Sequence, residues 1–369
     1  MTPVRCRQGG WLRMLVLLLL LGVALGLLAM GVRDRVGLDR PELSLGGEAC
    51  AIVPAPAGPE DLAIDGRTGM AVIAALDRRT EMAQGDLWTL DVADPDAEPR
   101  RLERDGPEDF RPHGLSLVRV GDALYAWVVN HPQDGHSLES FLIADGRAVH
   151  RATVRAEVVR SPNDVVAVDA DRFYVTNDHG SPPGPARLME DLLGLNLADV
   201  VYYDGQLARV VADGLSYANG VDLSRDGTQL VVSQTLAGTL TFMDREPETG
   251  SLAARLLVDL DAGVDNVSVA PDGSFWVASH PRLLDFVAHA RDGAKRSPTW
   301  VHRIQRVGSS AEVALVLADD GGRLSGGSVA AAWGDTLLVG GVFDDRLLRC
   351  ALAEAHAMGG APGETVPGT

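Results

Sequence analysis

Residues 219–234 read NGVDLSRDGTQLVVSQ, and this stretch decides the fold. A polar pair, Asn219-Gly220, is followed by two short segments in which apolar and polar residues alternate, which is the pattern of half-buried β-strands. Asp226-Gly227 separates the two segments and suits a tight hairpin turn. The same plan recurs five more times, each time after a pair of polar residues or glycines: Glu60-Asp61, His113-Gly114, Asn163-Asp164, Asp265-Asn266 and Gly326-Gly327.

These units recur at the length of one propeller blade. The second residues of successive pairs are separated by 53, 50, 56, 46 and 61 residues. Each interval accommodates four strands with their turns, and β-propellers are built from four-stranded blades. The sequence therefore predicts an all-β fold, a six-bladed β-propeller that occupies residues 38–357 as one domain. The tail at residues 358–369 is rich in Gly and Pro and is predicted to be flexible.

Residues 1–37 are predicted to form a separate N-terminal anchor and linker. Arg5, Arg7 and Arg13 precede an uncharged, Leu-rich run over residues 14–32, which is long enough to span a bilayer as a helix. Because the end of this run offers no convincing Ala-x-Ala cleavage site, an uncleaved signal anchor is favoured, with a cleaved signal peptide as the alternative. In both cases the propeller is exported, either anchored to the membrane or secreted.

Charge and cysteine content limit the partners and the compartment. A net charge of −18 argues against a nucleic-acid partner, because phosphate binding needs a basic surface. Cys50 and Cys350 bracket the propeller, near the seam where its first and last strands must join. An exported protein could join them in a disulfide, and this position favours the bond. Two separate buried thiols are the alternative.

Polar residues at the heads of the repeated units predict a metal site. The first strand of each propeller blade lines the central channel, so residues at the strand entrances converge there. Hard oxygen donors dominate the set and sulfur is missing, which favours Ca²⁺ over Zn²⁺. Turn formation explains any one pair, but five units of similar character favour the metal. The head residues are Glu60, Asp61, His113, Asn163, Asp164, Asn219, Asp265 and Asn266.

Taken in order, longer motifs resemble the paraoxonase/arylesterase family of calcium-dependent lactonases and esterases. They are PEDLAID, RPHGLSL, VVNHP with ESFLI, SPNDVVAVDADRFYVTNDH, LGLNLADVVYYDG, GLSYANGVDLSRDG, VDNVSVAPDGSFWVASHP and LLVGGVFDDRLLRCAL. The resemblance implies a six-bladed propeller with two channel calcium ions, an uncleaved hydrophobic N-terminus and a disulfide between Cys50 and Cys350. Residues 183–195 form a predicted amphipathic helix that matches the family's active-site lid. Residues 283–299 depart most from the family pattern, and no element is predicted there.

Matching motifs also imply individual roles. A catalytic calcium ion would be held by Glu60, Asn163, Asn219, Asp265 and Asn266. A structural calcium ion would be held by Asp61, Asp164 and the backbone carbonyl of Leu115. The histidines of PHG and NHP, which are His113 and His131, would form a catalytic dyad near Asp178. The remaining histidines without motif support, His136 among them, are predicted to be surface or packing residues.

The predicted function is calcium-dependent hydrolysis of a small lactone or aryl ester. His113 is suited to activate water, because imidazole titrates near neutral pH, and His131 would relay the proton or orient His113. One alternative is a propeller enzyme of the gluconolactonase or strictosidine-synthase type, which would not require the two histidines or the cysteines. The other is a non-catalytic scaffold that is tethered to the membrane by its N-terminal helix and binds calcium only for structure.

Overall fold

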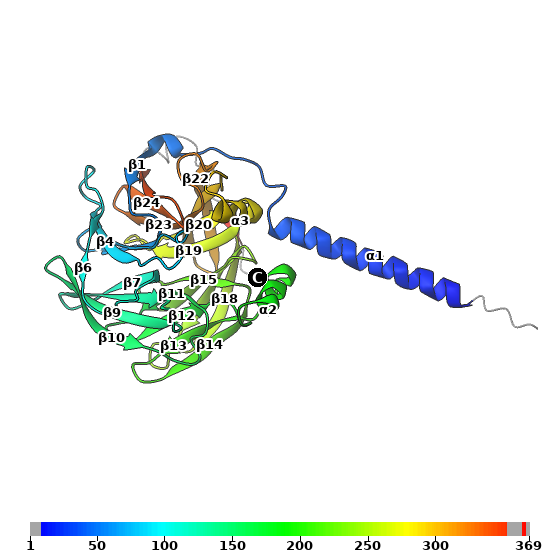
Figure 1. Cartoon of the computed structure of the whole chain (residues 1–369), viewed down its shortest axis with the longest axis horizontal. Coiled ribbons are helices and arrows are strands. Elements are labelled where there is room, and N and C mark those ends of the chain that lie inside the picture. Colours follow the sequence, from blue (N-terminus) through cyan, green and yellow to red (C-terminus); the bar gives the residue numbers. More distant parts are fainter. Residues whose placement is uncertain (1–8, 353–363, 367–369) are drawn as a thin grey trace, which may run out of the picture.

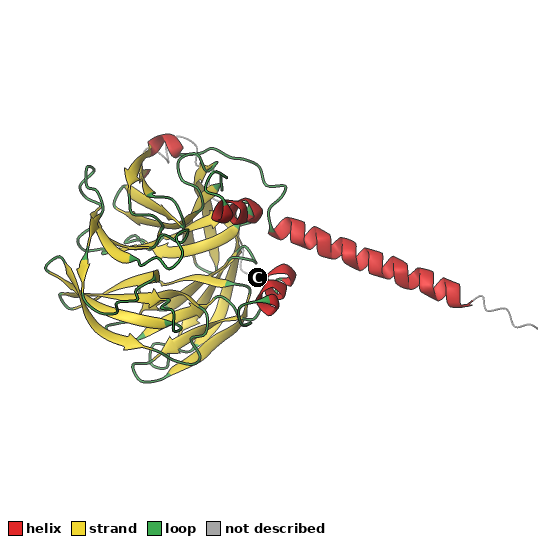
Figure 2. Cartoon of the chain, viewed as in Figure 1, coloured by secondary structure: helices red, strands yellow, loops and turns green. Residues whose placement is uncertain are grey.

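Six sheets form the body of the protein, and each repeated unit of the sequence supplies most of one sheet. Their strands pair antiparallel, apart from one short edge strand that pairs in parallel. The computed structural model describes residues 9–352 and 364–366. The innermost strands contact one another in a closed ring, in the order β2, β7, β11, β15, β19, β23 and back to β2. This ring confirms the predicted six-bladed β-propeller (Figure 2).

The blades run from the inner strand outward along the chain. Blade 1 has β2 (Pro59–Ile64), β3 (Met70–Ala75), β4 (Asp86–Asp91) and β5 (Arg100–Arg101). Blade 2 has β7 (Pro112–Val120), β8 (Ala123–Asn130), β9 (Ser137–Ala144) and β10 (Arg147–Val154), with β6 (Glu103–Arg104) at its outer edge. Blade 3 has β11 (Pro162–Ala167), β12 (Phe173–Asn177), β13 (Ala198–Tyr203) and β14 (Ala208–Leu215).

The remaining blades follow the same plan. Blade 4 has β15 (Ala218–Leu223), β16 (Gln229–Gln234), β17 (Thr239–Arg245) and β18 (Leu252–Asp259). Blade 5 has β19 (Gly263–Val269), β20 (Phe275–His280), β21 (Thr299–Val307) and β22 (Ser310–Asp319), extended by β26 (Glu364–Val366). Blade 6 has β23 (Gly327–Trp333), β24 (Thr336–Gly341), β25 (Arg346–Ala351) and β1 (Cys50–Pro54). Apart from β26, the predicted tail lies outside the described residues.

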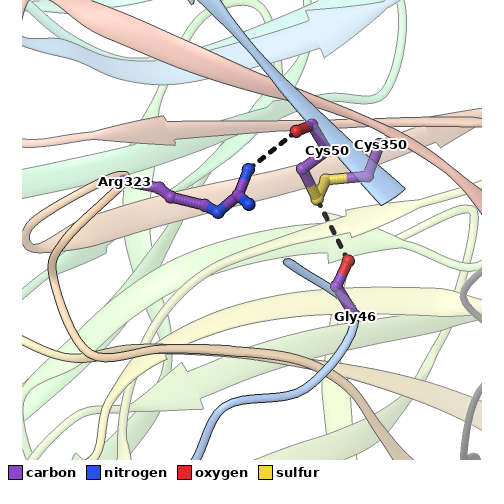
Figure 3. The surroundings of a disulfide bond; sticks show 4 residues. All are labelled: Gly46, Cys50, Arg323 and Cys350. Atoms are coloured by element: carbon purple, nitrogen blue, oxygen red, sulfur yellow. Dashed lines mark hydrogen bonds between the residues drawn. A yellow bond between two sulfur atoms is a disulfide. The ribbon is translucent and has the colours of Figure 1, made fainter. Parts of the chain in front are cut away.

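The ring closes in blade 6, where the first strand of the chain pairs with the last strand of the repeats. In this antiparallel pair Cys50 lies directly opposite Cys350, and the two form a disulfide, as predicted (Figure 3). Arg323 donates a hydrogen bond to the Cys50 carbonyl at 2.9 Å. The Gly46 carbonyl oxygen lies 3.5 Å from Cys50 Sγ, a van der Waals contact, because a disulfide sulfur carries no hydrogen.

Apolar side chains pack between the faces of neighbouring blades, which is where the core lies. Between blades 1 and 2, Val72 and Leu87 pack with Phe110 and Phe141. Between blades 3 and 4, the cluster includes Tyr174, Tyr202 and Leu230. Both faces of a middle strand take part in this packing, because successive side chains point to opposite faces of the sheet. In β3, for example, Ala71–Ala75 are all buried. The inner strands are thereby held rigidly around the channel.

A β-bulge interrupts every inner strand at its head. The register of pairing with the second strand shifts in all six blades, at or next to the polar or glycine pair. A bulge inserts one extra residue and redirects neighbouring side chains. The six shifts lie between Pro59 and Asp61, Pro112 and Leu115, Pro162 and Val165, Ala218 and Val221, Val264 and Val267, and Gly327 and Val329.

Within the described residues, three α-helices and one short 3-10 helix, η1 (Gly47–Ala49), complete the fold. The long α1 (Gly9–Arg35) projects from the propeller on the side where α2 (Pro185–Leu193) and α3 (Leu283–Arg291) lie (Figure 1). α2 confirms the helix predicted over residues 183–195. In the part of the chain that the structure describes, no helix is both long and apolar enough to cross a membrane. The membrane anchor stays a prediction.

Candidate metal centre and histidine cluster

Four of the five side chains predicted to hold the first calcium ion carry a buried oxygen with no hydrogen-bond partner among the described residues. These oxygens are Glu60 Oε2, Asn163 Oδ1, Asn219 Oδ1 and Asn266 Oδ1. The Arg78 guanidinium forms an ion pair with Glu60 Oε2 at 3.6 Å, a distance that is too long for a hydrogen bond. Each buried oxygen without a partner lowers the stability of the fold by about 1–3 kcal/mol. A bound cation would give all four oxygens a partner.

In two of these amides, a hydrogen bond donated by the side-chain nitrogen fixes the position of the side-chain oxygen. Asn219 donates its Nδ2 to Thr235 Oγ1 at 3.0 Å, and Asn266 donates its Nδ2 to Glu60 Oε1 at 3.2 Å. Because the nitrogen of each amide is engaged, the oxygen is the atom left for another partner. The fifth predicted ligand, Asp265, accepts a hydrogen bond from His280 Nε2 at 2.7 Å through Oδ2. His280 is therefore a supporting partner that lies outside the predicted ligand set.

The second predicted set, Asp61, Asp164 and Leu115, lies one step further along the inner strands. Asp61 accepts hydrogen bonds from the backbone N–H groups of Leu62 at 2.8 Å and Leu115 at 2.6 Å. Asp164 is bound in the same way, by Val165 at 2.7 Å and Val221 at 2.8 Å. Each carboxylate therefore links its own inner strand to the next one. All three predicted ligands border a cavity of about 230 Å³ between the inner strands.

Buried negative charge dominates both residue sets. Glu60, Asp61, Asp164 and Asp265 are each at most 5% exposed. Burial raises the pKa of both Asp61 and Asp164 well above the usual range for an aspartate; the charge of Glu60 adds to the effect on Asp61, and the charge of Asp61 adds to the effect on Asp164. Buried carboxylates at this density need protons or bound cations. Two divalent ions would balance the four carboxylate charges, and the predicted pair of calcium ions stays a prediction.

The donor set distinguishes between metals. Within the described residues, no three His, Cys, Asp or Glu side chains are placed to hold a metal ion by themselves. The amide oxygens of Asn163, Asn219 and Asn266 therefore have to contribute to any site here. A mixed set of carboxylate and amide oxygens suits Ca²⁺, whereas zinc takes nitrogen and sulfur ligands. The residues present fit calcium.

His113 and His131 meet beside this set, as the sequence predicted. His113 lies on β7, and its Nδ1 is 3.0 Å from Nε2 of His131, which follows β8. The other ring nitrogen of His113, Nε2, lies 3.6 Å from Glu60 Oε1. Burial and the neighbouring His113 lower the pKa of His131 well below its usual value, so this imidazole is neutral. The pair therefore joins a predicted calcium ligand to a neutral histidine.

The charge of Asp178 partly opposes the lowering of the His131 pKa, so the two side chains are near one another. The hydrogen bonds of Asp178, however, are made with other residues. Its Oδ1 accepts from Ser161 Oγ and lies 2.7 Å from His179 Nδ1. The other nitrogen of His179 lies 2.9 Å from Asp191 Oδ1, on α2. Asp178 is thus joined to α2 through His179, and its catalytic role stays a prediction.

α2 is also attached through its single buried acidic side chain. Glu190 accepts hydrogen bonds from the backbone N–H groups of Gly180 at 2.9 Å and Ser181 at 2.8 Å. These two residues belong to the loop that leaves β12, beside Asp178. The helix is therefore fixed to the end of blade 3 that carries a predicted catalytic residue, which suits a lid.

Arg78 and His136 are two residues near the site that sequence reasoning did not identify. Although burial opposes it, contact with His113 and the charge of Arg78, a partly buried residue, lower the pKa of Glu60. Nδ1 of His136 lies 2.9 Å from Nδ1 of His131. Arg78 follows β3 and His136 precedes β9, and neither belongs to a repeated pair or a motif. No signal in the sequence marks them, because their contacts depend on how the loops fold.

The fold and the site together define a six-bladed propeller with a channel centre of oxygen donors. A family model, Arylesterase, matches residues 67–352. Human serum paraoxonase/arylesterase 2 is 32% identical over 350 residues, which cover 90% of this chain and 98% of the human protein. Rat serum paraoxonase/arylesterase 1 is 35% identical over 248 residues, covering 66% of this chain and 69% of its own. The chain belongs to the paraoxonase/arylesterase family.

Solved structures show the same fold at low sequence identity. A luciferin-regenerating enzyme superposes with a TM-score of 0.50 and 12% identity, covering 82% of this chain and 95% of its own. A protein provisionally described as a gluconolactonase gives a TM-score of 0.51 with 13% identity, covering 88% and 95%. These likenesses concern the propeller architecture alone.

Proposed function

We propose that this protein is a calcium-dependent hydrolase of lactones and aryl esters. The observation that carries the proposal is the position of His113, whose Nε2 lies 3.6 Å from Glu60 Oε1, among side chains with unpaired buried oxygens. A general base next to a cation site is the arrangement that metal-assisted ester hydrolysis needs. Membership of the paraoxonase/arylesterase family supports the same reaction class.

The side chains divide the work between charge stabilisation and proton transfer. Glu60, Asn163, Asn219, Asp265 and Asn266 would hold one calcium ion, which when bound polarises a carbonyl oxygen and stabilises negative charge that develops on it. Asp61, Asp164 and the Leu115 carbonyl would hold the second ion, for structure. In this scheme the second ion neutralises the acids that join neighbouring inner strands.

His113 would accept a proton from the attacking water. Its Nε2 lies on the side of Glu60, while Nδ1 is engaged by His131. A neutral His131 that accepts at Nε2 sets the tautomer of His113, with the proton on Nδ1 and the lone pair on Nε2. That is the tautomer a general base needs. This role distinguishes a paraoxonase/arylesterase-type hydrolase from a gluconolactonase-type propeller enzyme, which would not require the two histidines.

The first experiment is hydrolysis of a panel of γ- and δ-lactones and phenyl acetate by the purified protein. Rates are measured with calcium, with excess chelator, and after calcium is restored. We expect turnover that disappears on chelation and returns with calcium. His113→Gln should lower kcat by about 10²-fold or more, which is typical of a lost general base. His302→Gln is the matched control, because His302 lies on β21, the third strand of blade 5.

Failure of this experiment has a definite meaning. Protein that is folded, binds two calcium ions by isothermal titration calorimetry and hydrolyses no substrate would support the scaffold alternative. Hydrolysis that survives full removal of calcium would contradict the proposed role of the metal. Full activity of His113→Gln would remove His113 as the base and favour another propeller chemistry.

We also propose that the propeller works outside the cytoplasm at a membrane surface. The disulfide between Cys50 and Cys350 suits an oxidising compartment. Next to the end of α1, two helices expose apolar side chains that would suit a lipid interface. These are Leu188, Met189 and Leu192 of α2, and Leu284 and Val287 of α3. Flotation of the full chain with liposomes, compared with a variant that lacks residues 1–37, tests this placement.

A further inference from the structure

A third imidazole continues the line formed by the two predicted catalytic histidines. Nδ1 of His131 lies 2.9 Å from Nδ1 of His136, and the two ring centroids are 5.0 Å apart. His113 and His131 have a similar ring separation, 5.2 Å. His113 and His136 are both partly exposed, and the His113 end of the line lies beside Glu60. The three rings therefore form a line from the predicted metal site to the connection between β8 and β9.

The ring contacts fit one consistent set of neutral tautomers. His113 donates from Nδ1 to Nε2 of His131, and His131 donates from Nδ1 to Nδ1 of His136. His136 then carries its own proton on Nε2, and the lone pair of His113 stays on Nε2. Each ring has one donor and one acceptor, so both ring contacts can be satisfied without any charge.

Ester hydrolysis at neutral pH needs a route for protons. A water and a lactone give a hydroxy carboxylate, and because the acid ionises, one net proton is released for each turnover. One hydrogen of the water ends on the leaving alkoxide as a hydroxyl group. The other leaves as a proton when the product acid ionises, and the base has to be restored to its starting state before the next cycle.

We propose that His136 is the proton outlet of the hydrolytic site, connected to His113 through His131. This inference rests on the proposed function. When His113 Nε2 takes a proton from water, its Nδ1 proton passes to His131 Nε2. The His131 Nδ1 proton passes to His136 Nδ1, and the His136 Nε2 proton leaves to solvent. Each imidazole gains one proton and loses one, so none stays charged. When His113 Nε2 then gives its proton to the leaving alkoxide, the shifts run in reverse and His136 Nε2 takes up a proton from solvent, which restores the starting tautomers. The net proton of the turnover is released when the product acid ionises.

The surroundings of His131 and His136 disfavour the protonated form of each ring, so neither histidine retains an extra proton. Burial, and the neighbouring His113, His136 and Arg78, lower the pKa of His131, against an opposing effect of Asp178. Burial also lowers the pKa of His136, where Arg155 and Arg187 oppose Asp178. A relay member whose protonated form is disfavoured releases its extra proton quickly.

The loop that carries His131 and His136 is held in place at several points. His131 donates its backbone N–H to the Arg111 carbonyl at 3.1 Å. Asp109 accepts the backbone N–H of Gln133 at 2.8 Å, and it also binds Arg111 at 2.9 Å. Preorganisation of this kind keeps proton donors and acceptors at hydrogen-bond distance without a conformational change. The relay geometry is thus built into the connection between β8 and β9.

His136→Gln tests the outlet in the full chain, because glutamine can hydrogen-bond but cannot pass a proton between two ring nitrogens. With a lactone substrate in about 1 mM buffer, we expect kcat to fall by about tenfold while KM changes little. Added imidazole at about 100 mM should restore most of the loss, because a small base can replace the missing one. His302→Gln, outside the relay, should show neither effect.

A second measurement does not depend on turnover. Nitrogen-15 NMR of the histidine side chains should report a proton on Nδ1 of His131. His136→Gln should shift the His131 ring resonances, whereas His302→Gln should leave them in place. An unchanged His131 spectrum in His136→Gln would overturn the relay by itself.

The kinetic outcomes separate the relay from the proposed function. If His113→Gln is inactive and His136→Gln keeps the wild-type kcat at every buffer concentration, the relay is wrong and the hydrolase proposal stands. If His136→Gln loses activity that imidazole does not restore, His136 has a structural role and the relay is also wrong. If His113→Gln is fully active, the base is misassigned and both proposals fall.

Discussion

The Asp164 carboxylate packs so closely against Gly114 that a Cβ added to the glycine would lie 2.3 Å from Asp164 Oδ1. The added atom would also lie 2.4 Å from the Cα of Asp164, which is backbone and cannot give way. Glycine at this position therefore lets β7 and β11 approach one another where the second calcium ion is predicted. The PHG motif has a structural reason for its glycine as well as a chemical reason for its histidine.

Gly114→Ala should lower the free energy of unfolding by about 1–3 kcal/mol, because the new methyl group overpacks the contact between two inner strands. The affinity for the second calcium ion should fall as well, since Asp164 has to move. Chemical denaturation and calcium titration measure the two effects. Gly66→Ala is the matched control, because there an added Cβ meets nothing closer than 3.8 Å. Equal stability of the two variants would contradict the close-packing argument.

The disulfide should contribute strongly to stability, because it closes a loop with a sequence separation of 300 residues. A model based on chain entropy gives about 5 kcal/mol for a loop of this length, less any strain. A Cys50→Ala/Cys350→Ala double variant should therefore unfold at a much lower denaturant concentration than the oxidised wild type.

Reduction of the wild type provides the control for this prediction. Dithiothreitol should bring the wild type close to the double variant and leave the double variant unchanged. The β1–β25 ladder remains in both forms, so the propeller should stay folded at low denaturant concentration. A wild type that is insensitive to complete reduction would show that strand pairing alone secures the closure.

The blade count and the predicted ligand residues follow from the sequence because they are local patterns. A hairpin turn such as Asp226-Gly227 and a polar pair such as Asn219-Gly220 can each be recognised within a few residues. The bulge at each strand head is less visible, because it depends on pairing with the second strand. The choice of amide oxygen at Asn219 is not visible at all, since it is set by Thr235.

Contacts between distant segments explain what the sequence did not predict. His136 joins the histidine line only because the β8–β9 connection folds back over His131. α3 forms over nine residues that include a buried His289, which Arg79 contacts from the loop after β3. α2 is equally short but matches a family motif, whereas α3 lies in the stretch that departs most from the family pattern, so no motif marked it. Arg78 likewise lies close to Glu60 through tertiary packing rather than through a motif.

Arg78 should weaken calcium binding while it stabilises the protein without calcium. Its guanidinium lies 3.6 Å from Glu60 Oε2, which is an oxygen that the calcium ion would use. Arg78→Met removes a positive charge from beside the ion, so calcium affinity should rise by about tenfold. In excess chelator the same variant should unfold more easily, by about 3 kcal/mol, because Glu60 loses its partner.

Arg79→Met is the matched control for Arg78→Met. The Arg79 guanidinium donates to the carbonyl oxygens of His289 and Ala290 on α3, so its charge is directed away from Glu60. Calcium affinity should change little in this variant. Isothermal titration calorimetry and thermal unfolding in chelator measure both variants, and a similar gain in affinity for the two would rule out a specific effect of Arg78.

His179 should make the attachment of the lid helix depend on pH. Although burial opposes it, contact with Asp178 and Asp191 raises the pKa of His179 to about 9 in the folded protein, from an ordinary value of 6.5. A histidine whose pKa is raised on folding stabilises the fold fully below pH 6.5. The contribution is lost as the pH rises from 6.5 to 9, because the folded protein then gives up the extra proton.

The stability difference between wild type and His179→Gln should therefore be largest at pH 6 and should shrink steadily up to pH 9. Hydrogen exchange of the α2 amides should show the lid loosening over the same range. His302 should show the opposite pH dependence. Burial lowers the pKa of His302 in the folded protein to about 4, so its contribution to the free energy of unfolding is lost as the pH falls from 6.5 to 4. If the His179→Gln difference stayed constant from pH 6 to 9, the imidazolium would not be what holds α2 in place.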